Sequence, residues 1–199
     1  IGNKIGVVYL SDGRSSKGWK NPSKEIAKIR RYEEAQKVVK NLSIDFSKYL
    51  NGLSGQIINN NELVDPIVES IELFSPNIIM VPYVNDPHSD HYEANMILSS
   101  ALKKVKLNIS NIDIFSYEVW SFVPANVYCD ISDFIEQKCK VLMNYKVAMQ
   151  VVNYIKDCEE RSLFHGIRQG KRLGLFEAFY KLKANIYLKM LLNNSTNLI

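Results

Sequence analysis

The residues best suited to carry chemistry lie together in one short segment. Two of the three histidines and two carboxylates occupy six consecutive positions: Asp86, Pro87, His88, Ser89, Asp90 and His91. Imidazole nitrogens and carboxylate oxygens are the groups that bind zinc, and imidazoles also exchange protons near neutral pH. The segment therefore indicates a metal site or an acid–base site.

The spacing within this segment supports the functional interpretation. His88 and His91 are three residues apart, which places both rings on one side of a helix start. Asp90 is a candidate for holding an imidazole in one tautomer. Two histidines are nevertheless too few for a zinc site with three protein ligands. A purely structural interpretation also stands, because aspartate and proline favour turns and helix N-termini.

The elements around the segment predict where it lies. The apolar run at residues 77–83 directly precedes it and predicts a buried strand. Open α/β folds bind their ligands at the carboxyl ends of such strands. An earlier apolar run, residues 4–10, ends at Asp12, which either faces the same edge of the sheet or belongs to a simple turn. Aromatic residues near strand ends, Tyr83, Tyr117 and Trp120, form either a sugar-stacking surface or part of the core.

Hydrophobic periodicity predicts alternating strands and helices. We expect strands at residues 4–10, 78–81 and 111–121. We expect helices at residues 23–42 with Ser23 as N-cap, 62–74, 92–105, 130–158 and 172–192, and irregular structure at 45–61. This order predicts an α/β fold with a mostly parallel sheet covered on both faces. Residues 1–199 are expected to form a single domain, with a disordered tail at 193–199.

Three further side chains have both a functional and a structural interpretation. Arg30 either pairs with Glu33 on the helix surface or binds a ligand. Glu177 lies among apolar residues, so it either closes a pocket or pairs with a cation such as Arg168. His165 is isolated and favours a structural role.

Composition limits the class of protein. The chain has 199 residues, of which 46% are hydrophobic and 23% charged, as expected for one soluble domain with a real core. A net charge of +4 does not indicate nucleic-acid binding. Cys129, Cys139 and Cys158 form no CxxC pair, which favours a reducing, cytoplasmic setting. No apolar run is long enough to span a membrane, and the sequence leaves a homo-oligomer open.

Taken in order, these features resemble the PIG-L (LmbE-like) family of zinc-dependent N-deacetylases. The D-x-H-x-D-H pattern of residues 86–91 is the most specific part of the resemblance. The other matching segments are residues 7–13, 29–35, 117–120, Lys138 with Tyr145, and residues 177–179.

The resemblance implies a Rossmann-like three-layer fold and hydrolysis of a linear amide, the N-acetyl group of an amino sugar or glycoconjugate. His91 would bind zinc, and His88 would act as an acid or stabilise the tetrahedral intermediate. Asp90 would orient His88 and complete the catalytic residues. The zinc would polarise the acetyl carbonyl and lower the pKa of its water. The expected substrate-binding residues are Arg30, Asp86, Asp12 and Glu177.

One family feature has no counterpart in this sequence. The family takes its remaining zinc ligands and its general base from an H-P-D-D motif, and no such motif is present. The family would place that motif before Lys4, so we expect the sequence to be N-terminally incomplete. A protein that truly began at Ile1 would be inactive. The alternative is a catalytically inactive sugar-binding or scaffold protein with the same fold. A nucleotide-binding enzyme is disfavoured, because no glycine-rich phosphate-binding motif follows a predicted strand.

Overall fold

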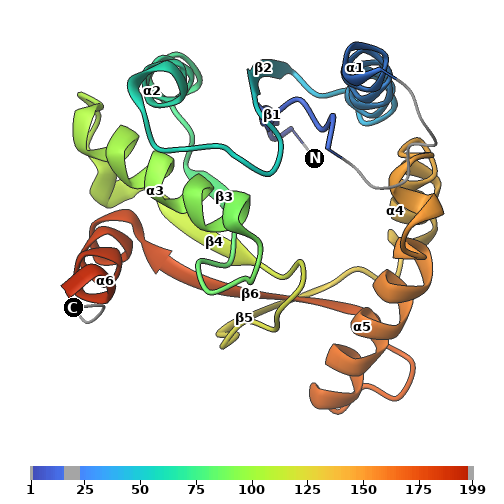
Figure 1. Cartoon of the computed structure of the whole chain (residues 1–199). Helices are drawn as coiled ribbons and strands as arrows, with labels where there is room; N and C mark the ends of the chain where they lie inside the picture. Colours follow the sequence, from blue (N-terminus) through green and yellow to red (C-terminus); the bar gives the residue numbers. More distant parts are fainter. Residues whose placement is uncertain (1, 16–22, 197–199) are drawn as a thin grey trace. The chain divides into compact units, whose positions relative to one another are not determined.

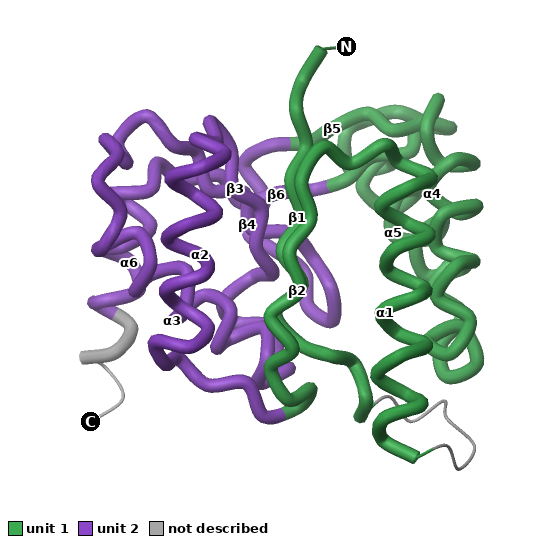
Figure 2. Tube along the Cα trace, turned by 90° about the horizontal axis from the view of Figure 1, so that it is seen from above, with its two compact units in different colours: residues 1–55, 128–177 green, residues 56–127, 178–199 purple. Residues whose placement is uncertain are grey.

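The computed structural model describes residues 2–15 and 23–196, which fall into two compact units (Figure 2). The first unit contains residues Ile1–Gly55 and Tyr128–Glu177, and the second contains Gln56–Val127 and Ala178–Ile199. Each unit is therefore built from two separate stretches of chain. The expectation of a single domain over residues 1–199 stays a prediction.

The first unit begins with a strand–helix–strand motif (Figure 1). Strand β1 (Gly6–Ser11) runs parallel to β2 (Phe46–Gly52), and helix α1 (Lys24–Asn41) connects them. Parallel neighbours need such a crossover because a tight hairpin cannot join them. The hydroxyl of Ser23 accepts a hydrogen bond from the backbone N–H of Ile26, which confirms the predicted N-cap.

The helices at the other end of the first unit correct the predicted helix over residues 130–158. That range holds the end of β5 (Val127–Asp130), α4 (Ile135–Leu142), the short 3₁₀ helix η2 (Ala148–Gln150) and the start of α5 (Tyr154–Arg168). Asparagines mark the interruptions. Asn144 hydrogen-bonds back to the carbonyl of Val141, and Asn153 caps α5 by accepting from the N–H of Lys156. Such local bonds compete with a continuous helix.

The second unit holds most of a four-stranded mixed sheet, with helices packed against it. Strand β3 (Ile78–Pro82) is parallel to β4 (Asp113–Tyr117). Strand β6 (Phe176–Lys183) is antiparallel to β4. The order of strands in the sheet is β3-β4-β6-β5. Helix α3 (Ser89–Lys104) packs against β3, and α6 (Ala184–Thr196) packs against β4. Helix α2 (Asn61–Phe74) packs on α3, and the short 3₁₀ helix η1 (Ile109–Asn111) precedes β4.

The predicted α/β class is confirmed. The prediction of a mostly parallel sheet is confirmed only in part. The pairs β1–β2 and β3–β4 are parallel, but β6 is antiparallel to β4 and occupies residues predicted as helix within 172–192. The Rossmann-like three-layer arrangement stays a prediction. The range 45–61, predicted as irregular, contains β2. Residues 193–196 of the expected tail belong to α6, and residues 197–199 lie outside the described residues.

No helix in the described part of the chain combines the length and hydrophobicity needed to cross a membrane.

A close backbone approach in the first unit requires a glycine in α5. A Cβ built on Gly166 would lie 1.7 Å from the backbone oxygen of Gly174. We expect Gly166→Ala to lower the free energy of unfolding by about 2 kcal/mol, because the α5 backbone must move to relieve the overlap. Urea denaturation measures the loss, with Glu160→Ala at an exposed position of the same helix as the control. Equal stability of the two variants would contradict this packing.

Candidate active site

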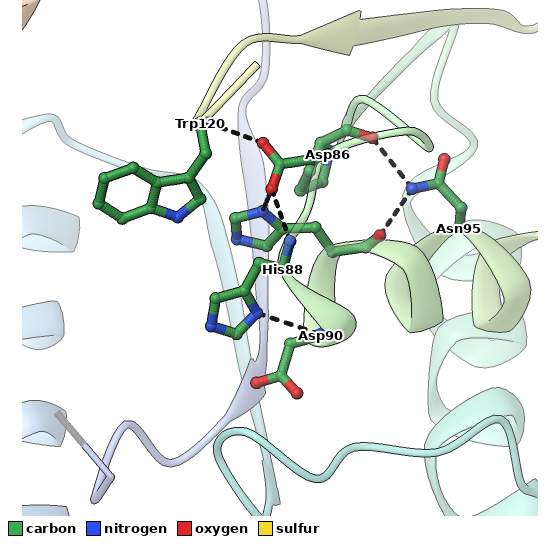
Figure 3. Close-up of polar contacts among 7 residues, drawn as sticks. Asp86, His88, Asp90, Asn95 and Trp120 are labelled. Carbon is green, nitrogen blue, oxygen red and sulfur yellow. Dashed lines mark hydrogen bonds and ion pairs between the residues drawn. The ribbon is translucent and has the colours of Figure 1, made fainter.

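The buried carboxylate of Asp86 is the centre of the predicted site (Figure 3). Its side chain is fully buried in the loop that follows β3. Its Oδ2 accepts a hydrogen bond from the backbone N–H of Trp120 at 2.7 Å. Its Oδ1 accepts from the backbone N–H of His88 at 3.1 Å and from Nδ1 of His91 at 2.8 Å. Both oxygens are thus bound by groups of the protein itself.

These hydrogen bonds keep Asp86 ionised. Burial alone would raise the pKa of its carboxyl, but the hydrogen bonds from Trp120, His88 and His91 outweigh burial and hold the pKa below its usual value. The resulting negative charge acts on a neighbour. Burial, together with the charge of Asp86, raises the pKa of Tyr117 to about 12, so its phenol is neutral at physiological pH.

His88 caps the amino end of α3. Its Nδ1 accepts a hydrogen bond from the backbone N–H of Asp90 at 3.1 Å, so this nitrogen carries no proton. The proton of the neutral ring is therefore on Nε2. The side chain is exposed, so Nε2–H is a hydrogen-bond donor accessible from solution.

His91 has the opposite arrangement. Its Nδ1–H donates to Asp86, which leaves the lone pair of Nε2 to bind a metal ion or a proton. The rings of His88 and His91 stack with centroids 4.7 Å apart and an angle of 27° between their planes. The structure thus presents one ring as a donor and its neighbour as an acceptor or ligand.

The chemistry of His91 fits a metal ligand, but the described residues alone do not complete a metal site. A carboxylate that holds the second ring nitrogen is the usual support for a metal-bound histidine. Residues 2–15 and 23–196 contain no group of three or more histidine, cysteine, aspartate or glutamate side chains arranged to hold an ion. His91 therefore stays a predicted ligand.

Asp90 contacts His88 through its backbone N–H. The sequence had suggested Asp90 as a residue that holds an imidazole in one tautomer. Its N–H binds Nδ1 of His88, and its carboxylate accepts a hydrogen bond from the N–H of Ile57 at 3.4 Å. The hydrogen bond between a carboxylate and an imidazole joins Asp86 and His91 instead. Asp86, expected to bind substrate, has both oxygens occupied by internal donors.

The sequence interpretation missed Asn95, which fixes α3 behind the histidines. This side chain is fully buried. Its Nδ2 donates to the carbonyl of Pro82 at 3.0 Å and to that of His91 at 2.7 Å, while its Oδ1 accepts from the hydroxyl of Tyr187 at 2.7 Å. A polar residue beside the apolar Ala94 and Ile97 was the available signal, since buried amides must find partners.

The remaining predicted residues belong to the first unit. Asp12 is buried and accepts from the backbone N–H of Arg14, with which it also forms an ion pair. Arg30 is exposed on α1. Glu177 lies on β6 and pairs with Lys138, not with the suggested Arg168.

Lys138, on α4, is held by the carboxylate of Glu177. Burial lowers its pKa, but the charge of Glu177 and its hydrogen bond to Lys138 outweigh burial, and the pKa is raised overall. His165 lies buried on α5 rather than in a loop, with its ring 5.9 Å from that of Tyr128. These contacts agree with the structural interpretation of His165.

An α/β protein with paired histidines at a helix start, one held by a buried carboxylate, is built for acid–base or metal-assisted chemistry. The chain belongs to the PIG-L family. The sequence profile of that family, described as GlcNAc-PI de-N-acetylase, matches residues 1–102 and so includes the Asp86–His91 segment. No curated protein sequence matches the chain.

Solved structures similar to this chain show the same fold. The conserved protein TT1542 from Thermus thermophilus is 18% identical, with 92% of this chain and 83% of that chain covered and a TM-score of 0.74. N,N'-diacetylchitobiose deacetylase from Pyrococcus horikoshii is 18% identical, with 92% and 74% covered and a TM-score of 0.75. GalB, the 4-carboxy-2-hydroxymuconate hydratase from Pseudomonas putida, is 15% identical, with 90% and 84% covered and a TM-score of 0.71. Since deacetylases and a hydratase share it, this fold does not by itself select one reaction.

Replacing the central carboxylate tests the network around Asp86. A carboxyl whose pKa is lowered in the folded state adds stability above its unfolded pKa and loses it as pH falls through the folded pKa. We expect Asp86→Asn to lower the free energy of unfolding at neutral pH by about 2 kcal/mol. The difference from the wild type should shrink below about pH 4. Urea denaturation at several pH values measures both effects.

The control for this variant is Asp65→Asn. Asp65 forms an exposed ion pair with Lys104 at 2.9 Å, and such pairs contribute little. If Asp86→Asn and Asp65→Asn had the same small effect at neutral pH, the buried network would contribute nothing to stability.

The hydrogen bonds of Asn95 predict two losses of stability that differ in size. Asn95→Asp places a carboxylate against the carbonyls of Pro82 and His91 and should cost about 3 kcal/mol of stability. Tyr187→Phe removes one donor and should cost about 1 kcal/mol. Thermal and urea unfolding compare these variants with Asn111→Asp, a change at an exposed asparagine. A neutral Asn95→Asp would show that the amide does not make these bonds.

Proposed function

We propose that this protein is a metal-dependent hydrolase that removes the N-acetyl group from an amino sugar or glycoconjugate. The observation that carries the proposal is the division of roles between two adjacent imidazoles. His91 offers a lone pair at Nε2, and His88 offers a proton at Nε2. Metal-assisted amide hydrolysis uses both kinds of group, a ligand that holds the metal ion and a donor to the carbonyl oxygen or the leaving amine. Membership of the PIG-L family supports the same reaction.

The chain's own residues have distinct tasks in this proposal. The Nε2–H of His88 donates a hydrogen bond to the oxygen on which negative charge develops, or gives its proton to the departing amine. Asp86 keeps the His91 ring oriented and, through the backbone N–H groups of His88 and Trp120, holds the surrounding loops in place. Arg30, Asp12 and Glu177 stay predicted substrate contacts.

The residues support a divalent metal ion, with zinc as the candidate, at Nε2 of His91. Such an ion, when bound, polarises the acetyl carbonyl and lowers the pKa of water. The proposal requires further ligands beyond the described residues, because His91 alone cannot hold a catalytic zinc. Cys129, Cys139 and Cys158 are free thiols, which supports the proposed cytoplasmic setting.

Amine release from N-acetylglucosamine conjugates and from N,N'-diacetylchitobiose tests the function, using the full-length protein loaded with zinc. We expect His88→Gln to lower kcat by a factor of about 10² to 10³ while the bound zinc is unchanged. His91→Gln should lose both the zinc and the activity. Asp65→Asn, the change in an exposed ion pair, serves as the control.

Two results would overturn parts of this proposal. Full zinc occupancy without amine release from a broad panel of acetylated sugars would favour the sugar-binding or scaffold alternative. Retention of zinc by His91→Gln would remove His91 from the metal site.

A further inference from the structure

The loop after β4 is attached directly to the histidine segment. Its residue Trp120 donates its backbone N–H to Oδ2 of Asp86, the carboxylate that also holds the ring of His91. A second bond stabilises the loop, from the N–H of Val123 to Oε1 of Glu118 at 3.0 Å. The position of the Trp120 backbone is therefore coupled to that of the two imidazoles.

The indole of Trp120 is exposed although its backbone is anchored. The residue retains 47% of its accessible surface. In Figure 3 the side chains of Trp120 and His88 both lie on the side of Asp86 away from Asn95. Exposing an aromatic ring costs free energy that burial would recover, so an exposed indole next to the polar groups of the site indicates a binding surface.

The charges around this surface limit what it can bind. Residues 86–95 and 113–123 contain no lysine or arginine, but they contain the carboxylates of Asp90, Glu93 and Glu118. A phosphate or carboxylate ligand would find no cation from these segments. A neutral ligand with an apolar ring face suits them better, because aromatic faces attract the C–H bonds of a sugar ring.

We propose that the indole face of Trp120 binds the sugar ring that carries the N-acetyl group, and thereby selects carbohydrate amides over small acyclic amides. The inference rests on the proposed function for the reaction at His88 and His91. Binding of a sugar at Trp120 can be measured without turnover of the substrate.

Intrinsic fluorescence provides the binding test. Trp19 is the other tryptophan of the printed sequence, so the variant Trp19→Phe removes its emission, and the part of the response that Trp120→Leu abolishes comes from Trp120. Titration with N-acetylglucosamine should give a saturable change in emission, whereas acetamide, which has the amide but no sugar ring, should give none. Absence of a saturable response to N-acetylglucosamine, or an equal response to acetamide, would overturn the proposal.

Kinetics provide the second test. Trp120→Leu keeps the backbone N–H that binds Asp86 but removes the aromatic face. We expect KM for an N-acetylglucosamine substrate to rise about tenfold, with kcat within about twofold of the parent. Trp120→Phe should recover part of the loss. Leu73→Ala, at an exposed apolar residue near the carboxyl end of α2, is the matched control and should leave KM unchanged.

The two tests separate this inference from the proposed function. An unchanged KM in Trp120→Leu would overturn the role of Trp120 even where deacetylation is confirmed. A saturable fluorescence response without any amine release would support sugar binding at Trp120 and overturn the hydrolase assignment.

Discussion

A buried negative charge sets the geometry of this site. An unpaired carboxylate inside a protein is very unfavourable. The folded backbone must therefore keep hydrogen-bond donors in contact with Asp86. Those donors belong to the loop after β4, to the start of α3 and to the ring of His91. Any displacement of the loop after β4 or of α3 relative to Asp86 breaks a charge-assisted bond, so these two elements and the loop that carries Asp86 are held in one arrangement.

This arrangement gives two identical side chains different chemistry. His88 and His91 have almost touching rings, yet one ring accepts at Nδ1 from a backbone N–H and the other donates at Nδ1 to a carboxylate. The tautomers follow from these partners and not from the imidazoles themselves. Enzymes commonly obtain an acid and a base from like residues by placing them in unlike surroundings.

The parts of the site that are close in sequence could be predicted, and the long-range parts could not. The Asp86–His91 segment, the strand before it and the Ser23 cap follow from local residue patterns. Strand β6 lies in residues 172–192, which were predicted as helix, but pairing with β4 decides its conformation. Likewise, no local signal joins Asn95 to Tyr187 or Lys138 to Glu177, because each pair meets only after the chain has folded.

The bond between Asn95 and Tyr187 also bears on how the protein is made. The hydroxyl donor lies 92 residues after the amide that receives it. At typical ribosomal speeds, the helix with both histidines is synthesised on the order of ten seconds before its partner exists. Until then Oδ1 of Asn95 lacks the hydroxyl donor that it has in the folded protein. The long-range bond that fixes α3 behind the two histidines therefore forms only after α6 has been synthesised.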